Sequence, residues 1–300
     1  MGKDLAEVFP QAKARFEEAD SILQYSLSRL CWEGPAEALT RTEHCQPALY
    51  VASMAALAAL QAESQRCQAP QCLAPTATGG LSLGEYTALA ADGAVSFQDG
   101  LKLVHLRGQE MEEAAQAAPG TMASILGLEL EPVQAICSET GAEVANLNAP
   151  GQIVISGTPQ AVEAASAKAK EKGAKRVIPL EVGGAFHSRL MQPAVGRLQQ
   201  AIERVAVQGP AFPVFSNVTG AYYSGPDQVK VLLVQQLTHP VRWVECIQTL
   251  IGDGIRFFLE VGPGTVLKGL VRKIDPETEV LSVGTADQVR ETVARLAQSA

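Results

Sequence analysis

Apolar side chains recur at helical spacing along the first hundred residues of the chain. The pattern predicts a helix over residues 5–23, an alanine-rich helix over residues 47–63, and a third helix that begins at Leu83. Between the second and third helices, the apolar and β-branched run CLAPTAT at residues 72–78 favours a buried strand, although Pro75 disfavours a central one. A strand, a glycine-rich turn and a helix are therefore expected in succession.

The pattern changes after residue 120. Runs typical of strands and helices follow in the order strand, helix, strand, strand, helix, strand, over residues 121–128, 131–139, 142–147, 152–156, 159–172 and 176–180. This βαββαβ order, complete within about sixty residues, is that of the ferredoxin-like fold. The sequence therefore predicts a small inserted ferredoxin-like domain at residues 120–187.

Strands and helices alternate again in the last third of the chain. The expected elements are a helix over residues 190–205, a strand over 214–217, helices from Asp227 and Val241, a strand over 257–261, a glycine-proline-glycine turn and a C-terminal helix. Alternation of this kind favours a parallel sheet covered by helices on both faces. The predicted fold is α/β, with a large α/β-hydrolase-like domain built from residues 1–119 and 188–300.

Composition and charge indicate a cytoplasmic protein. Apolar residues make up 47% of the chain and charged residues 19%, as in compact soluble proteins. The net charge of -8, without a long run of either sign, argues against nucleic-acid binding. Six scattered cysteines predict free thiols and no metal site. The charged N-terminus and the short apolar run at residues 49–60 predict neither a secretory signal nor a membrane span.

The pentapeptide Gly80-Leu81-Ser82-Leu83-Gly84 contains the candidate nucleophile. In a G-x-S-x-G motif between a strand and a helix, small residues let the backbone bend sharply and expose the serine hydroxyl. The alternative is an ordinary polar serine in a glycine-rich loop. The predicted context of strand, turn and helix favours the nucleophile.

A serine hydroxyl needs a base within hydrogen-bonding reach, and the chain offers four histidines. His44 and His105 are expected to be surface or packing residues, and His239, which precedes a proline, could be structural. His187 follows two glycines and precedes a helix at the junction of the predicted domains, where catalytic loops are common. A helix-capping or solvated histidine remains the alternative for His187.

Arg107 is a candidate for binding an acidic substrate, because its planar fork matches a carboxylate with two parallel hydrogen bonds. From the sequence alone, the favoured explanation is a helix-surface arginine paired with Glu110 or another nearby acid. Gln236, in QQLTHPVRW, is explained as a surface glutamine.

Eight stretches taken together resemble one family. They are CQPALY, GLSLGEYTAL, LRGQEM, NAPGQIVISG, AFHSRLM, FPVFSNVTG, QLTHPVRW and FLEVGPGTVLKGLVRKI. In this order, they are similar to the malonyl-CoA:acyl carrier protein transacylases of fatty-acid and polyketide synthesis, and they cover nearly the whole chain. A free-standing enzyme of this kind is expected to serve fatty-acid synthesis, as a monomer and without a cofactor.

The resemblance implies a ping-pong transfer of a malonyl group. Ser82 would attack the thioester of malonyl-CoA with His187 as general base, and the phosphopantetheine thiol of acyl carrier protein would then collect the group. Arg107 would hold the malonyl carboxylate, and the side-chain carbonyl of Gln236 would orient the histidine. The N–H of Leu83 would supply an oxyanion donor.

The sequence departs from the family pattern at two places. The family usually has histidine before the nucleophile, where this chain has Leu81, so we expect altered surroundings of the acyl chain. Family members also begin with a short strand and a glycine-glutamine turn before a segment like MGKDL, with which this chain starts. We therefore expect that the natural protein begins upstream of Met1, and that the missing turn would supply a second oxyanion donor.

Two other functions compete with malonyl transfer. One is an acyl hydrolase on the same fold, but an enzyme for neutral acyl chains has no use for a buried Arg107. The other is a non-catalytic module that docks acyl carrier protein, against which the presence of Ser82, His187 and Arg107 argues. The accepted extender unit, malonyl or methylmalonyl, stays open at this point.

Overall fold

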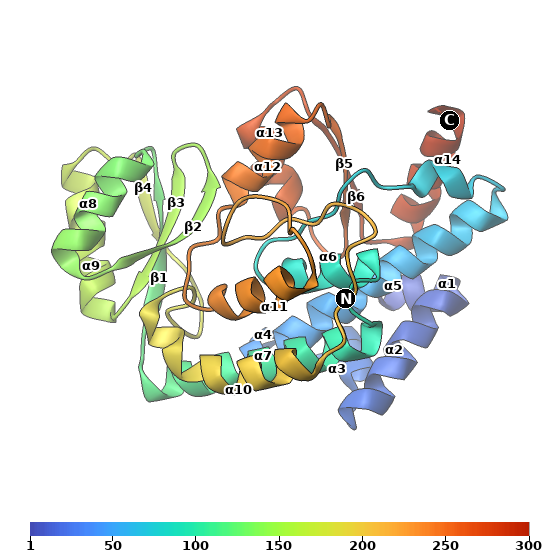
Figure 1. Cartoon of the computed structure of the whole chain (residues 1–300), viewed down its shortest axis with the longest axis horizontal. Coiled ribbons are helices and arrows are strands. Elements are labelled where there is room, and N and C mark those ends of the chain that lie inside the picture. The colour runs from blue at the N-terminus through green and yellow to red at the C-terminus, as the bar shows by residue number, and fades with distance from the viewer. Residues whose placement is uncertain (300) are drawn as a thin grey trace.

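Two lobes are visible in the computed structural model, which describes residues 1–299 (Figure 1). Residues 121–179 build the lobe at the left of Figure 1, and the segments before and after them build the larger lobe. Each lobe contains both helices and strands, so the expected α/β class is confirmed.

Helices dominate the N-terminal part of the larger lobe. They are α1 (Lys3–Val8), α2 (Pro10–Leu23), α3 (Leu27–Glu33), α4 (Ala36–Thr40) and α5 (Thr42–Arg66). The single helix expected over residues 5–23 is wrong, because the chain leaves helical geometry at Phe9 (φ -116°, ψ 111°). Pro10 lacks an N–H and disfavours helical backbone at the preceding residue, so it begins a new helix.

The alanine-rich helix α5 is the central helix of the larger lobe. By length and composition alone it could cross a membrane, but 61% of its most apolar stretch is buried inside the molecule. It packs against α2, α6 (Leu83–Asp92) and α7 (Phe97–Ala117). Tyr50 on α5 donates a hydrogen bond of 3.0 Å to the carbonyl of Phe97. We therefore assign α5 to the core.

The strand expected over residues 72–78 is wrong. Pro70–Leu73 form a 3₁₀ helix, and Thr78 makes a single parallel bridge to the segment at residues 214–217. Pro75 has no N–H to donate, and the glycine turn begins directly after Thr78, so a longer ladder cannot form. The strand expected over 214–217 is likewise reduced to isolated bridges.

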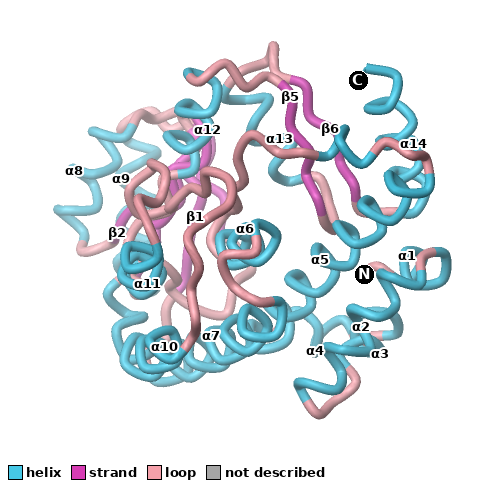
Figure 2. Tube along the Cα trace, turned by 45° about the vertical axis from the view of Figure 1, so that its right-hand side comes forward, coloured by secondary structure: helices cyan, strands magenta, loops and turns pink. Residues whose placement is uncertain are grey.

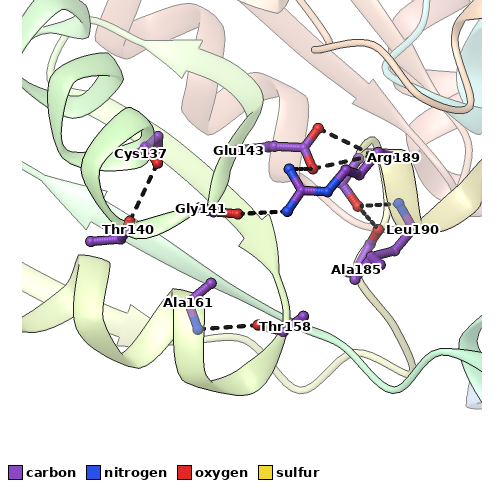
Figure 3. Close-up of polar contacts among 10 residues, drawn as sticks. Cys137, Thr140, Gly141, Glu143, Thr158, Ala161, Ala185, Arg189 and Leu190 are labelled. Atoms are coloured by element: carbon purple, nitrogen blue, oxygen red, sulfur yellow. Dashed lines mark hydrogen bonds and ion pairs between the residues drawn. The ribbon is translucent and has the colours of Figure 1, made fainter.

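The smaller lobe contains all six elements that the sequence predicts there. They are β1 (Thr121–Leu126), α8 (Leu130–Thr140), β2 (Glu143–Ala149), β3 (Gln152–Gly157), α9 (Pro159–Glu171) and β4 (Arg176–Pro179). The strands lie in the order β2-β3-β1-β4, and all neighbours are antiparallel. Helix α9 is capped by Thr158, whose hydroxyl oxygen accepts from the N–H of Ala161 at 3.2 Å (Figure 3).

The C-terminal third returns to the larger lobe. After a 3₁₀ turn at Arg189–Met191 come α10 (Gln192–Arg204), α11 (Pro226–Gln235), α12 (Trp243–Gly252), β5 (Phe257–Val261), α13 (Val266–Ile274), β6 (Glu279–Val283) and α14 (Ala286–Ser299). β5 and β6 pair in parallel and lie side by side in Figures 1 and 2. Strand β6 was not expected. In the described part of the larger lobe, the expected parallel sheet is therefore limited to this pair and the bridge at Thr78.

A main-chain contact joins the two lobes. Asn146 of β2 forms a parallel bridge with Val241, which lies between α11 and α12. The N–H of Val241 donates to the carbonyl of Ala145, and the N–H of Leu147 donates to the carbonyl of Val241, both at 2.8 Å. Because β2 is an edge strand, this pairing covers an edge that would otherwise be open.

Candidate active site

A sharp backbone turn carries Ser82 between the bridge at Thr78 and the start of α6, which lies near the middle of the molecule (Figure 2). Ser82 has φ 52° and ψ -103°, a conformation that a residue with a side chain adopts only when its surroundings hold it there. A Cβ atom at Gly80 would lie 2.1 Å from the backbone of Gly84, so only glycine fits at position 80.

His187 lies opposite Ser82, on the loop by which the chain leaves the smaller lobe. Its Nε2 atom is 2.8 Å from Ser82 Oγ, and its Nδ1 atom is 2.8 Å from the main-chain oxygen of Gln236. A carbonyl oxygen only accepts, so Nδ1 carries the proton and Nε2 is the acceptor for the serine hydroxyl. This is the tautomer that a general base requires. His187 also has a left-handed backbone, with φ 57°.

The imidazole of His187 is held in its neutral form. The side chain is 5% exposed. Burial, and after it the nearby Arg107 guanidinium, lower the pKa of His187 to about 4. At neutral pH, the imidazole is therefore free to accept a proton.

The guanidinium of Arg107, on α7, reaches the hydroxyl of Ser82. Its Nη2 donates to Ser82 Oγ and to Gln236 Oε1, both at 3.0 Å, and Nη1 donates to Gln46 Oε1 at 2.6 Å. The side chain is 1% exposed and lies 5.5 Å from the ring centre of Tyr86. Among the described residues, the Nε–H of Arg107 has no hydrogen-bond partner. A buried cation with an unused donor is suited to holding an anionic group.

Gln236 acts on His187 through its main chain and on other groups through its side chain. The expectation that its side-chain carbonyl orients the histidine is wrong, because that oxygen accepts from Arg107. Its Nε2 donates to the main-chain oxygen of Ser82 at 3.0 Å and to Glu85. Gln236 caps the C-terminus of α11, where the last carbonyls have no partner within the helix, so its carbonyl is free to accept from the imidazole.

Comparison with known proteins gives the family. The family model described as an acyl transferase domain matches residues 1–274 of the chain. The chain belongs to the acyl transferase family. Among curated relatives of this acyl transferase, the malonyl CoA-acyl carrier protein transacylase of Bacillus subtilis is 43% identical, over 99% of this chain and 92% of that protein.

Solved structures resemble this acyl transferase over nearly its whole length. The malonyl CoA-acyl carrier protein transacylase of Coxiella burnetii has a TM-score of 0.93 and 37% identity, and the match covers 99% of this chain and 93% of that chain. A malonyl-transacylase in complex with its type II polyketide-synthase acyl carrier protein has a TM-score of 0.92 and 36% identity, over 98% of this chain and 94% of that chain. The α/β fold of the acyl transferase is therefore that of these enzymes.

Two residues that the sequence does not single out hold the site of this acyl transferase together. Asn217 accepts from the N–H of Ser82 at 2.6 Å and donates to the carbonyl of Gly80 at 2.8 Å, so one side chain fastens both arms of the turn. Glu85 is completely buried and accepts from the N–H of Asn217 at 3.2 Å, from Tyr223 and from the side chain of Gln236. The signal in the sequence is slight, namely a polar residue beside an apolar run in each case.

Leu81 and Leu83 flank the nucleophile in different surroundings. Leu81 packs against the buried cluster that contains Phe215 and Trp243. Leu83 is the first residue of α6, so its N–H has no acceptor within the helix. Its side chain packs against the main core of the larger lobe.

The other three histidines have different neighbours. His44 and His105 lie beside the ring of Tyr25, at 5.6 Å and 6.0 Å between ring centres. His239 is exposed, and its Nδ1 is 2.8 Å from the carbonyl oxygen of Gln235. Of the four histidines, all of which are described, only His187 hydrogen-bonds to Ser82.

The loop that carries His187 is fastened to the smaller lobe directly after the histidine (Figure 3). The main-chain N–H of Arg189 donates to the carboxylate of Glu143 at 3.1 Å, and Nη2 of the same arginine donates to the carbonyl of Gly141 at 3.2 Å. A cavity of about 410 Å³ opens beside His187, between α8, β2 and residues 238–240. The loop that carries His187 is thus fastened to the smaller lobe through Arg189, whereas the imidazole itself bonds to Gln236 of the larger lobe.

The arrangement supports attack of a serine on a carbonyl carbon. It combines a serine hydroxyl with a neutral imidazole and a buried cation, each of which lies within hydrogen-bonding distance of the hydroxyl. Within the described part of the chain, no group of three or more His, Cys, Asp or Glu side chains is placed to hold a metal ion.

Proposed function

We propose that this acyl transferase moves a malonyl group from malonyl-CoA to the phosphopantetheine thiol of an acyl carrier protein. The observation that carries the proposal is the contact of 3.0 Å between the buried Arg107 guanidinium and Ser82 Oγ. A cation in this place binds the free carboxylate of the malonyl group while Ser82 attacks the thioester end. The malonyl transacylases at 43% and 37% identity support the substrate, and the carrier-protein complex supports the acceptor.

The first half-reaction forms a malonyl-serine ester. Ser82 Oγ bonds to the thioester carbon while His187 Nε2 takes the hydroxyl proton. The carbon-sulfur bond then breaks, and the thiol of coenzyme A leaves with the proton from the imidazolium. The hydrogen bond from Nδ1 to the carbonyl of Gln236 stabilises the imidazolium that forms in between.

The second half-reaction repeats these steps with the carrier-protein thiol. His187 Nε2 takes the thiol proton while the sulfur attacks the ester carbon. The bond to Ser82 Oγ breaks, and Oγ regains the proton from the imidazolium. Malonyl is thereby carried on the pantetheine sulfur, and the enzyme returns to its first state.

Three groups of the enzyme contact the malonyl group while it is attached to Ser82. The Nε–H and Nη2–H of Arg107 lie on one edge of the guanidinium and form a fork for the carboxylate, for which Nη2 exchanges its bond to Ser82 Oγ. The N–H of Leu83 donates to the oxyanion, because it begins α6 and is unused by the helix. Leu81 gives the acyl chain an apolar neighbour in place of a polar one.

Hydrolysis and carrier-protein docking without turnover explain the site less well. A hydrolase of neutral acyl groups would leave the buried charge of Arg107 without a purpose, at a high desolvation cost. A docking module would not need a serine and a histidine 2.8 Å apart in the reactive tautomer.

The architecture fits this role as well. We propose that residues 120–187 are a ferredoxin-like domain, which the strand order β2-β3-β1-β4 supports. Residues 1–119 and 188–300 would then form an α/β-hydrolase-like domain that holds the nucleophile. The protein is proposed to act in the cytoplasm as a monomer.

Intact-protein mass measurement after mixing with malonyl-CoA tests the function. The wild type is expected to gain one malonyl group, Ser82→Ala to gain none, and Arg107→Ala to load malonyl at least about a hundredfold more slowly, since a charge-assisted bidentate contact is lost. Arg197→Ala is the control, because Arg197 is an exposed arginine of α10 that pairs with Glu110 and Glu113 of α7.

Two results would overturn the proposal. A folded wild type that gains no mass would exclude malonyl transfer. Equal loading of Arg107→Ala and Arg197→Ala would exclude the carboxylate-binding role of Arg107. Addition of holo acyl carrier protein should then remove the malonyl group from the enzyme and place it on the carrier.

A further inference from the structure

Glu85 is a buried carboxylate that lies three residues after Ser82 in the sequence. It belongs to the first turn of α6 and has no exposed surface. Its oxygens accept from the main-chain N–H of Asn217, from the hydroxyl of Tyr223 and from the side-chain amide of Gln236. A carboxylate this deeply buried is retained at high cost in desolvation, and no step of the proposed malonyl transfer uses it.

A single amide side chain connects this carboxylate to the substrate-binding cation. The Nε2 of Gln236 donates to Glu85, and the Oε1 of the same amide accepts from Arg107 Nη2 at 3.0 Å. The negative and positive charges therefore lie at the two ends of one oriented dipole. Burial is the largest effect on Arg107 and lowers its pKa, whereas the nearby Glu85 raises the pKa and so favours the charged guanidinium.

We propose that Glu85 is the internal counter-ion of Arg107 and takes up one proton from solvent when a malonyl carboxylate binds to the guanidinium. This inference rests on the proposed malonyl transfer. Without substrate, the buried site holds one positive and one negative charge. A malonyl carboxylate adds a second negative charge to the same cation, and the repulsion is relieved when the Glu85 carboxylate becomes a neutral acid.

Four titratable groups face Glu85, and of these five groups only Glu85 has a pKa near neutral pH. They are Tyr86 on its own helix, Arg107 on α7, Tyr223 before α11 and Cys246 on α12. Burial is the largest effect on each of the four, and it raises the pKa of the two tyrosines and the cysteine, so all three stay protonated. Burial also raises the pKa of Glu85 to about 7, against the hydrogen bonds that lower it.

The proposal predicts how malonyl binding changes with pH. Above the pKa of Glu85, the wild type must take up a proton to bind malonyl, so its KM for malonyl-CoA rises with pH, by up to about tenfold per unit. Acetyl-CoA brings no carboxylate, so the ratio of the two KM values isolates the effect from the titration of coenzyme A itself.

Glu85→Gln is the variant that decides. An amide combines an N–H donor group with an acceptor oxygen, much as a protonated carboxyl group combines an O–H donor with an acceptor oxygen, and it cannot ionise. The ratio of KM for malonyl-CoA to KM for acetyl-CoA in the loading reaction should rise about tenfold or more in the wild type between pH 6 and pH 8.5, and stay flat in Glu85→Gln. The matched control is Asp92→Asn on the same helix, because Asp92 is 9% exposed and binds the N–H groups of Ala211 and Phe212, away from Arg107.

The outcomes separate this inference from the proposed function. No malonyl adduct on the wild type would refute malonyl transfer itself. An adduct with a KM ratio that is independent of pH, or the same pH dependence in Glu85→Gln and the wild type, would overturn the counter-ion role alone. If Glu85→Gln does not fold, proton uptake by the wild type can be measured instead, with a pH indicator in weak buffer at pH 7.5. Loading from malonyl-CoA should then absorb more protons than loading from acetyl-CoA. Equal proton uptake from the two substrates would refute the inference.

Discussion

Asn217 is the residue on which the shape of the nucleophile turn depends most directly. Its side chain accepts from the N–H of Ser82 and donates to the carbonyl of Gly80, two groups that no helix or strand satisfies. Its own N–H is held in turn by Glu85. The unfavourable backbone of Ser82 is therefore maintained by three hydrogen bonds made by a single asparagine.

Replacement of Asn217 by alanine should reduce both stability and loading. It leaves the buried carbonyl of Gly80 and the half-buried N–H of Ser82 without partners, at roughly 1–3 kcal/mol each, so a drop in Tm of several degrees is expected. Asn217→Asp keeps an acceptor for Ser82 but loses the donor to Gly80, and it should lie between alanine and wild type. Thermal unfolding and the rate of malonyl loading measure the two effects.

A matched asparagine provides the control. Asn148 has a buried side-chain oxygen with no partner among the described residues, so Asn148→Ala should change Tm little. Equal losses of Tm in the two alanine variants would contradict the role of Asn217 in holding the turn.

The candidate residues could be predicted from the sequence only where they belong to a known motif or have a distinctive side-chain chemistry. Ser82 stands in a recognisable pentapeptide, and His187 and Arg107 carry distinctive chemistry. Glu85 stands three residues after Ser82, the spacing of a capping box, in which the glutamate is an ordinary helix-start residue. Its burial depends on Tyr223 and Gln236, more than 130 residues away, and periodicity does not report such contacts.

At the scale of elements, the geometry at the start of α6 determines where the hydroxyl of Ser82 lies. The two glycines of the motif play different parts. A side chain at Gly80 would collide with the backbone of Gly84 at 2.1 Å, whereas a Cβ at Gly84 would meet nothing within 4 Å. Only the glycine before Ser82 is therefore required by the protein's own packing.

Alanine at each glycine should give opposite results. Gly80→Ala forces α6 away from the turn and should lower Tm strongly or prevent folding. Gly84→Ala should hold or raise Tm, because alanine is favoured over glycine within helices by about 1 kcal/mol. Thermal unfolding of the pair is the measurement, and a wild-type Tm for Gly80→Ala would refute the steric argument.

The fold was predictable where local signals agree. The six elements of residues 121–179 follow from alternation, helical periods and the Thr158-Pro159 cap. The single helix over residues 5–23 failed because Pro10 outweighs a continuous apolar period. The parallel sheet of the larger lobe was overestimated, because strand-like composition at residues 72–78 does not show whether a partner lies close enough to pair.

At the scale of the whole molecule, the site contributes two opposite dependences of stability on pH. Burial raises the pKa of Glu85 to about 7 from the ordinary 4.5, so its contribution is full below pH 4.5 and is lost as the pH rises through 7. Burial lowers the pKa of His187 to about 4 from 6.5, so its contribution is present above pH 6.5 and is lost as the pH falls through 4. Between pH 4.5 and 6.5 the two partly cancel.

Replacement of Glu85 by glutamine should reveal how much this carboxyl group contributes to the pH dependence of stability. The Tm of Glu85→Gln minus that of the wild type should increase from pH 4.5 to pH 7.5, because ionisation of the buried Glu85 destabilises only the wild type. All other titrating groups cancel in the difference. A difference that is constant over this range, measured by thermal unfolding in matched buffers, would contradict the raised pKa of Glu85.

Ser82 and His187, the proposed nucleophile and base, share one feature of backbone geometry, since both have positive φ. Glycine is the residue that such a backbone accepts without strain, and neither position can have glycine without losing its chemistry. Selection for heat resistance alone would therefore favour replacements at these two positions that abolish turnover. An engineer who wants a more robust enzyme should fix both residues, and the partners that hold them, before a library is made.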